Sequence, residues 1–199
     1  MDGAAECGAQ TELVNIYDKH FKGCVSCFAC KIKGSKCGGL CAIKDDMRPI
    51  LEKAFEADII VLGTPVYFNS MTSGARAFTE RLLFPIDTYL VDESGQRLNV
   101  PHKKVATAVI YDMNCPRDFM DKVNYRTLLG DIEHEYARLL GSSEILYVNN
   151  TYQFTDYSRY ECNMFPEEMK KKQLEEQFPR DLEAAFALGK RLAEKASQN

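Results

Sequence analysis

The sequence predicts a doubly wound α/β fold, in which helices cover both faces of a parallel sheet to give three layers. Two short, continuous apolar runs, at residues 58–63 and 104–111, are typical of strands that are buried on both faces. Segments with helical apolar spacing alternate with these runs, and such alternation favours a parallel sheet. With 199 residues, 45% of them hydrophobic, the chain is long enough to bury one core.

The elements of the first half follow from local patterns. Residues 11–17 alternate apolar and polar side chains and predict the first strand. Residues 45–55 begin with two aspartates, carry Pro49 in the first turn and then show helical spacing, so they predict a helix. The second strand is expected at residues 58–63, and residues 73–83 predict the helix that follows it.

The second half continues the alternation. The strand at residues 104–111 is followed by a helical segment at 118–140, for which Gly130 is the expected break and Gly141 the expected cap. A last strand is expected at residues 144–148. Residues 166–195 are mostly charged and helical in spacing, interrupted by Pro179. We therefore expect a single domain over residues 1–199, with residues 150–199 as a C-terminal helical extension.

The charge balance narrows the classes of partner. Lys and Arg number 25 and Asp and Glu 29, and a net charge of −4 argues against a surface for nucleic acid or anionic membranes. No apolar run approaches the roughly 20 residues of a membrane helix. The first residues lack the apolar core of a signal peptide. These features predict a cytoplasmic protein that binds neither nucleic acid nor membranes.

The eight cysteines are concentrated in one part of the chain. Five of them fall in an 18-residue stretch: Cys24, Cys27, Cys30, Cys37 and Cys41. A secreted disulfide scaffold spreads its cysteines along a short chain, and this chain is long enough to fold without such cross-links. The cluster therefore indicates a metal site or redox chemistry. A set of buried or merely tolerated thiols is the alternative.

The loop after the strand at 58–63 is the main candidate for ligand binding, because ligands of open parallel sheets bind beyond the carboxyl ends of strands. Tyr67 and Phe68 stand there beside small and polar residues, just before a helix start. Such a loop can lay a ring and backbone N–H groups against a flat heterocycle. The alternative is a turn whose aromatic side chains pack on the domain itself.

Two segments together resemble a known family. Residues 63–81 (GTPVYFNSMTSGARAFTER) resemble the flavin loop and following helix of the flavodoxin-like NAD(P)H-dependent FMN reductases. Residues 24–30 (CVSCFAC), followed by residues 41–47 (CAIKDDM), resemble the cysteine segment of the iron-sulfur flavoproteins in that superfamily. Both segments occur in the family's order, and the resemblance extends over about residues 11–148.

The resemblance implies a flavodoxin-like fold, an FMN cofactor and NAD(P)H as electron donor. It assigns the first flavin-ring loop to Thr64, Pro65, Val66, Tyr67, Phe68 and Asn69. It assigns the second to the end of the next strand, at Tyr111 and Asp112. Hydride transfer to a stacked flavin relies on the cofactor, so we expect no catalytic acid or base. The three histidines show no spacing that suggests a site.

The cysteine segment has the spacing of an iron–sulfur site. C-x2-C-x2-C can hold three thiolates on one [4Fe–4S] cluster, with a fourth from further along the chain. By resemblance, Cys41 takes the fourth position after Cys24, Cys27 and Cys30. The intervening loop is longer than in the iron-sulfur flavoproteins, and Cys37 within it competes for that role. A structural zinc and a site without metal are the alternatives.

The N-terminus departs from the family. Family members begin with a strand, a phosphate-binding loop and a helix, whereas residues 1–11 match only the end of that helix and the turn after it. We therefore expect weak FMN binding. The absent strand would be an inner one, which leaves two unpaired strand edges and favours association as a homodimer or higher homo-oligomer.

Three functions are compatible with this pattern. The leading hypothesis is an FMN-dependent oxidoreductase that passes electrons from NAD(P)H, or from a carrier protein, to an unidentified small-molecule or protein acceptor. The alternatives are a flavodoxin-like electron-transfer protein and a non-enzymatic domain that has lost tight flavin binding. Flavin and iron–sulfur absorption bands would separate the first two from the third.

Overall fold

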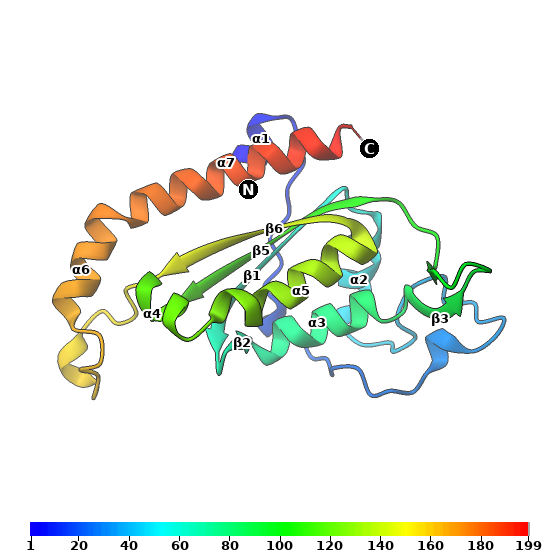
Figure 1. The fold of residues 1–199 in the computed structure, drawn as a ribbon, viewed down its shortest axis with the longest axis horizontal. Helices are drawn as coiled ribbons and strands as arrows, with labels where there is room; N and C mark the ends of the chain where they lie inside the picture. Colours follow the sequence, from blue (N-terminus) through cyan, green and yellow to red (C-terminus); the bar gives the residue numbers. More distant parts are fainter. Residues whose placement is uncertain (199) are drawn as a thin grey trace.

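A four-stranded sheet in the order β2-β1-β5-β6 forms the middle layer of the computed structural model, which describes residues 1–198 (Figure 1). The three long strands run parallel: β1 (Ile59–Tyr67), β5 (Val105–Met113) and β6 (Gly141–Asn149). The short strand β2 (Ser70–Met71) pairs antiparallel with the end of β1. The carboxyl ends of β1, β5 and β6 therefore lie at one edge of the sheet.

Helices cover both faces of this sheet, as the fold class requires (Figure 1). One face carries α2 (Met47–Glu56), α3 (Ser73–Leu83), α4 (Arg117–Lys122) and α5 (Tyr125–Leu140). The other face carries α7 (Phe178–Ala196), against which α1 (Asp2–Glu6) packs. The central strand β5 serves both layers: Val109 contributes to the core under α3 and α5, whereas Ala106 and Ala108 contact Leu188 and Leu192 of α7.

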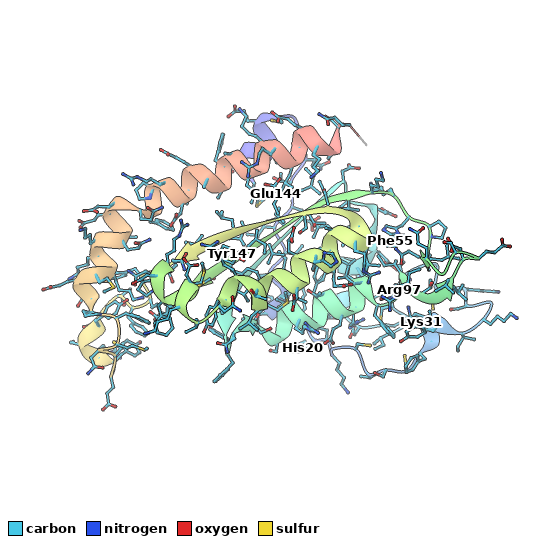
Figure 2. The ribbon with its side chains drawn as sticks, viewed as in Figure 1. His20, Lys31, Phe55, Arg97, Glu144 and Tyr147 are labelled. Carbon is cyan, nitrogen blue, oxygen red and sulfur yellow. The ribbon has the colours of Figure 1, made fainter. Side chains whose placement is uncertain are left out.

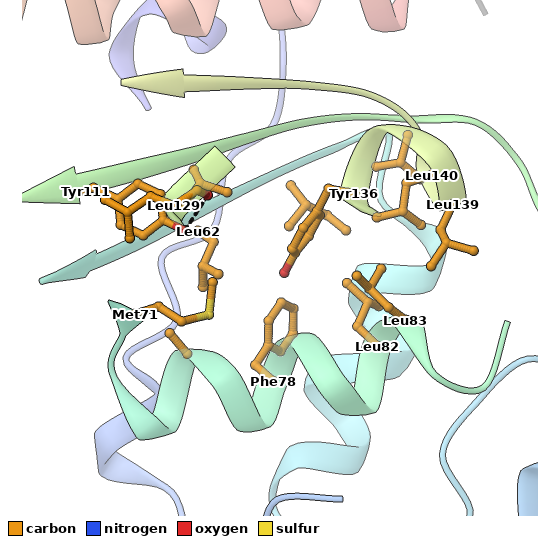
Figure 3. Close-up of a cluster of buried hydrophobic side chains, with 14 of the residues drawn as sticks. Leu62, Met71, Phe78, Leu82, Leu83, Tyr111, Leu129, Tyr136, Leu139 and Leu140 are labelled. Carbon is orange, nitrogen blue, oxygen red and sulfur yellow. Dashed lines mark hydrogen bonds between the residues drawn. The ribbon is translucent and has the colours of Figure 1, made fainter. Parts of the chain in front are cut away.

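The larger core lies between the sheet, α3 and α5 (Figure 3). Phe78 and Leu82 of α3 meet Tyr136 and Leu139 of α5 there, and all four are at least 95% buried. The Tyr136 hydroxyl also forms a hydrogen bond of 3.0 Å with Thr79 Oγ1. This bond satisfies two buried polar atoms and fixes the two helices relative to each other.

Smaller elements complete the chain. They are a hairpin of β3 (Asp87–Val91) and β4 (Arg97–Asn99), the helix α6 (Glu167–Glu176), and 3₁₀ turns at Ile16–Asp18, Ala29–Lys31 and Tyr157–Arg159. Among the described helices, none is both long and apolar enough to cross a membrane.

Most expected elements are confirmed, with shifted ends. The helix at 73–83 is confirmed at both ends by α3, and Gly141 (φ 122°) ends α5 as the expected cap. The break in the segment 118–140 was expected at Gly130 and lies instead at Asn124, whose left-handed backbone (φ 58°) separates α4 from α5. Likewise, α7 begins before Pro179, because proline fits the first helical turn.

The strand expected at residues 11–17 is wrong. Residues 11–15 have no regular structure, and a 3₁₀ turn follows at Ile16–Asp18, where the Asn15 side chain accepts a hydrogen bond of 3.1 Å from the Tyr17 N–H. Tyr17 packs against Gly74 in the first turn of α3. No strand of the described chain pairs with this segment, and alternation alone cannot make a strand without a hydrogen-bonding partner.

One edge of β1 is open, as the sequence led us to expect. Within residues 1–198, β1 pairs with β5 on one side and on the other only with β2, through Val66 and Tyr67. Val61 in this open part is 48% exposed although its neighbours Ile60 and Leu62 are buried. The second open edge, expected on the strand at 11–17, is absent because that strand does not form.

Candidate functional site

The four cysteines proposed as metal ligands line one small pocket at the end of the molecule that carries the β3–β4 hairpin. Cys41 is buried, Cys24 and Cys30 are half-buried, and Cys27 is exposed. Cys37 is not among the lining residues, and its Sγ lies 3.8 Å from the Ala29 carbonyl oxygen. The fold therefore brings together the set in which Cys41, rather than Cys37, is the fourth member.

The thiols share this pocket but do not converge on one metal position. In residues 1–198, no three Cys, His, Asp or Glu side chains are close enough to hold one metal ion. Burial raises the pKa of the Cys30 thiol, and the nearby Cys41 and Cys27 raise it further, against the opposing charge of Lys31. A metal or cluster would thus have to displace protons and draw in thiols that already face the same pocket. The donor set, four sulfurs, suits an iron–sulfur cluster or zinc.

Hydrogen bonds close the base of the cysteine loop, the segment of residues 23–44 that contains the five clustered cysteines. The His20 N–H donates to Asp46 Oδ2 (2.8 Å), and the Asp46 N–H donates back to the His20 carbonyl (3.3 Å). The Lys22 N–H donates to Asp45 Oδ2 (3.3 Å). The two flanks of the loop are therefore joined on either side of the cysteines, so its ends are fixed although its interior has little regular structure.

A buried arginine on α3 reinforces this closure. Arg81 Nη1 donates to Asp45 Oδ2 (2.6 Å) and to the Lys22 carbonyl (3.0 Å), and Nη2 donates to the Ile43 carbonyl (3.2 Å). The third guanidinium nitrogen, Nε, is buried and makes no well-aligned hydrogen bond within the described residues. An unsatisfied buried donor costs about 1–3 kcal/mol, and more when it is charged.

A second cation, Lys31, lies near Cys30 and Cys24, outside the residues that line the pocket. Its ammonium donates to the carbonyls of Phe84 and Asp87 and lies 4.4 Å from the centre of the Phe84 ring. Lys31 and Arg97 both lie at the hairpin end of the molecule, far from Tyr147 near the carboxyl edge of the sheet (Figure 2). The cysteine pocket is therefore flanked by positive charge, which suits an anionic, sulfur-rich ligand.

The first expected flavin loop forms the tight turn between β1 and β2. Tyr67 pairs with Ser70, so the turn consists of Phe68 (φ 49°) and Asn69 (φ 65°), both left-handed. Two-residue hairpins favour this geometry, but a bulky residue with positive φ is strained. Phe68 is fully exposed and Tyr67 is 61% exposed, so neither ring packs on the body of the domain. Such strain is typical of functional loops.

The rest of this loop is anchored below the turn. Thr64 is buried, and its Oγ1 lies 3.2 Å from Thr72 Oγ1 and accepts a hydrogen bond of 3.1 Å from the Thr72 N–H. Thr72 in turn caps α3 by accepting from the Ala75 N–H at 3.5 Å. Pro65 and Val66 are half-buried. The Thr64 hydroxyl thus supports the turn from within.

The second expected loop lies beside the first. Pro65 of β1 is in register with Asp112 of β5, so both loops leave the same edge of the sheet. Tyr111 itself is fully buried: its hydroxyl lies 3.5 Å from the Leu129 carbonyl oxygen, its ring stacks on Tyr147, and burial raises its pKa to about 12. Burial also raises the pKa of the Asp112 carboxyl. Asp112 is one residue nearer than Tyr111 to the carboxyl end of β5, where the second loop begins.

A lysine that the sequence analysis missed supports this second loop. Lys170 of α6 is 1% exposed, and its ammonium donates to the Asn114 carbonyl (2.6 Å) and to the Asn114 side chain. Gln173, one turn later, donates to the Asn149 carbonyl (3.1 Å) at the end of β6. Helix α6 therefore ties the carboxyl ends of β5 and β6 together.

The two candidate regions lie at opposite ends of α3 (Figure 1). Thr72 caps its N-terminus beside the flavin loop, whereas Arg81 and Phe84 line the cysteine pocket at its C-terminus. A helix of 11 residues spans about 16 Å. Within one chain, the cysteine pocket and the exposed aromatic turn are therefore separate sites.

Comparison with known proteins identifies the relatives of this chain. The family model for NADPH-dependent FMN reductases matches residues 1–111. An iron-sulfur flavoprotein of Methanocaldococcus jannaschii is 37% identical over 81 residues, which are 41% of this chain and 39% of that protein. An iron-sulfur flavoprotein of Archaeoglobus fulgidus is 39% identical over 74 residues, 37% of this chain and 34% of that protein. The matches thus span well under half of these relatives.

The whole fold has structural neighbours as well. An NAD(P)H:quinone oxidoreductase from Methanothermobacter marburgensis superposes with a TM-score of 0.57 at 14% identity, over 96% of this chain and 83% of that one. This likeness establishes the flavodoxin-like fold. The family match covers more than half of the sequence and contains both the cysteine segment and the aromatic turn. The chain belongs to the NADPH-dependent FMN reductase family.

Proposed function

We propose that this protein is an FMN-dependent oxidoreductase that takes electrons from NAD(P)H, or from a carrier protein, and passes them to a small-molecule or protein acceptor. The observation that carries the proposal is the carboxyl edge of β1 and β5. There the register of Pro65 with Asp112 sets two loops side by side, next to the exposed rings of Tyr67 and Phe68. Family membership supports this assignment.

The flavin would lie against the turn formed by Thr64, Pro65, Val66, Tyr67, Phe68 and Asn69, with the end of β5 at Tyr111 and Asp112 on its other side. Bound FMN supplies the hydride-accepting chemistry. The chain contributes orientation: Thr64 braces the turn through Thr72, and Lys170 braces the neighbouring loop through Asn114. No acid or base of the chain is assigned a proton-transfer role.

For the cysteine pocket, we propose a [4Fe–4S] cluster held by Cys24, Cys27, Cys30 and Cys41. The shared pocket, the flanking cations Arg81 and Lys31, and the relatives named as iron-sulfur flavoproteins support this ligand set. Zinc on the same four thiolates is the alternative, and Cys37 is the competing fourth ligand.

We further propose that the protein acts in the cytoplasm as a homodimer or higher homo-oligomer. The open edge of β1, with Val61 half-exposed, and the exposed rings of Tyr67 and Phe68 support association. A flavodoxin-like electron-transfer protein without its own NAD(P)H site is the second candidate function. The separation of the two sites along α3 favours it, because electrons could enter and leave at different ends.

The first experiment tests cofactor content. Protein purified and reconstituted without oxygen should show flavin absorption bands and a broad iron–sulfur shoulder near them, with iron and sulfide in matching amounts. Oxidation of NADPH or NADH by the loaded protein would favour the reductase over the electron carrier. A protein that takes up neither flavin nor iron would contradict the proposed function.

The ligand set is tested with a matched pair of variants. Cys41→Ser should lose the cluster, because it removes a buried thiol that lines the pocket. Cys37→Ser should keep it, because Cys37 lies in the same loop but outside the pocket lining. Iron and sulfide content is the measurement, with far-UV circular dichroism as the control for folding. The opposite result would assign the fourth position to Cys37.

A further inference from the structure

Arg81 differs from the other arginines of the described chain in its burial and its placement. Its side chain is 0% exposed, although it forms an ion pair with Asp45 across 2.6 Å. Three hydrogen bonds connect it to both flanks of the cysteine loop, at Lys22 and Asp45 and at the Ile43 carbonyl. One side chain on α3 therefore holds both ends of the loop.

Arg81 also reaches the pocket itself. It is one of the pocket's lining residues. Although burial opposes it, the pKa of the Arg81 guanidinium is raised by Asp45 and then by the Cys41 thiol, which lies within hydrogen-bonding reach of the guanidinium. Its Nε is the one guanidinium nitrogen that makes no well-aligned hydrogen bond within the described residues. A buried N–H is normally hydrogen-bonded, and in a pocket lined by cysteines a thiolate or sulfide sulfur can accept the bond.

We propose that Arg81 is a positioning residue that holds the cysteine loop closed and sets the reduction potential of the cluster through its charge and its free N–H. This inference rests on the proposed function, because it requires a cluster bound by the four cysteines. It goes beyond that function because it assigns the control of the potential to a residue that is not a ligand.

The sign of the effect follows from electrostatics. Reduction adds one electron, and therefore one negative charge, to a site that is already anionic. A nearby positive charge or hydrogen-bond donor stabilises the reduced form and raises the potential, and the low polarity of a buried site strengthens this effect. Asp45, paired with Arg81, acts in the opposite direction. Arg81 and Asp45 should therefore shift the potential in opposite senses.

Other charges face the same region and must be considered. Lys31 lies near Cys30 and Cys24, Glu80 lines the pocket, and Arg48 donates to the Cys41 carbonyl at 2.6 Å. Lys31 is partly offset by Asp87. Arg48 is paired with Glu52 at 2.6 Å. Among these groups, only Arg81 combines complete burial with contacts to both flanks of the loop.

The test is the midpoint potential of the reconstituted cluster, followed by EPR of the reduced form during a dithionite titration. We would compare Arg81→Met, which removes the charge, Arg81→Lys, which keeps it, and Asp45→Asn, which removes the opposing charge but retains an acceptor oxygen. Lys53→Met is the control, because Lys53 is an exposed cation on α2 whose partner is Glu12. Iron and sulfide content confirms that each variant holds a cluster.

We expect Arg81→Met to lower the midpoint potential, Asp45→Asn to raise it, and Arg81→Lys to fall between Arg81→Met and the unaltered protein, with Lys53→Met unchanged. A purely structural role would loosen the loop in both variants and shift the potential in one direction. Shifts of the same sign, or no shift with clusters present, would overturn the role of Arg81 alone. Absence of iron and sulfide from the unaltered protein would overturn the cluster and this role together.

Thermal stability provides a second readout. If Arg81→Met does not take up a cluster, its potential cannot be measured. Thermal unfolding of the cluster-free variants then tests whether Arg81 holds the cysteine loop closed. A lower melting temperature in Arg81→Met, restored by Arg81→Lys, supports the closure of the loop. An unchanged melting temperature in a variant that does not load would contradict it.

Discussion

At the scale of single residues, the buried charges carry information that the sequence pattern hides. The spacing C-x2-C-x2-C pointed to Cys24, Cys27 and Cys30, whereas Cys41 was added as the fourth ligand only through the family resemblance, with Cys37 as its competitor. Arg81 and Lys170 were missed, because a single cation in an amphipathic helix resembles a residue of the solvent-exposed face. A signal was present for Arg81: it lies four residues after Ala77 and three after Phe78, on the apolar face of its helix.

Lys170 gives a prediction for the pH dependence of stability. Burial lowers its pKa to about 8, whereas an unfolded lysine titrates near 10.4. Between these values the unfolded chain binds more protons than the folded one, so the free energy of unfolding should rise with pH. From pH 7.5 to 9.5 we expect a rise of about 1–2 kcal/mol from this group. Chemical denaturation at several pH values measures it.

The comparison that isolates this group uses two neighbouring lysines of α6. Lys170→Met should lose the rise between pH 7.5 and 9.5, whatever its absolute stability. Lys171→Met should keep it, because Lys171 is 56% exposed in its side chain and is paired with Glu167. Equal slopes in the two variants would show that Lys170 does not titrate in this range.

At the scale of elements, the sequence predicted whatever depends on local pattern together with burial. The strands β1 and β5 were visible as apolar runs, and α3 was visible as apolar spacing. The segment at residues 11–17 failed because its alternation is local, whereas strand formation depends on a neighbour that the described sheet does not supply. The break at Asn124 failed for a related reason, since asparagine adopts the left-handed backbone that glycine was expected to supply.

The turn between β1 and β2 yields a prediction about strain. Phe68 adopts positive φ while fully exposed, so its ring contributes little packing to the fold and its backbone costs about 1 kcal/mol. Phe68→Asn should therefore raise the free energy of unfolding by about that amount, because asparagine tolerates this conformation. If the ring packs on flavin, FMN affinity should fall in the same variant.

Leu13→Asn is the matched control for this substitution. Leu13 is 80% exposed and lies outside the residues with positive φ, so the same change of side chain should leave stability nearly unaltered. Urea denaturation without flavin and fluorescence titration with FMN separate the two effects. A loss of stability in Phe68→Asn would show that the Phe68 ring supports the fold after all.

At the scale of the whole molecule, the two faces of the sheet are closed by different means. The face under α3 and α5 is sealed by large apolar side chains, and the sequence pattern predicted it. The other face is covered by α7 through Leu188 and Leu192, and α1 is held on α7 by close backbone approach: a Cβ on Gly3 would lie 2.0 Å from the Phe186 carbonyl oxygen. Nothing in the sequence marked Gly3 for this role, because such a contact joins segments that are far apart in the chain.

The open edge of β1 leads to a last prediction, about how the flavin is held. Flavin phosphate is a dianion whose binding relies on charge-assisted hydrogen bonds, each of about 1.5–3 kcal/mol, usually at a helix N-terminus. Within residues 1–198, no strand–loop–helix unit lies beside the open edge of β1, and the first turn of α3 is already capped by Thr72 and covered by Tyr17. The proposed ring contacts at Tyr67 and Phe68 would be the same for FMN and for riboflavin. We therefore expect this 199-residue chain to bind the two flavins with affinities within about tenfold of each other, and with little dependence on salt. Flavin fluorescence quenching at low and high ionic strength measures both quantities. A preference for FMN of several orders of magnitude that weakens with salt would instead show that another part of the chain grips the phosphate.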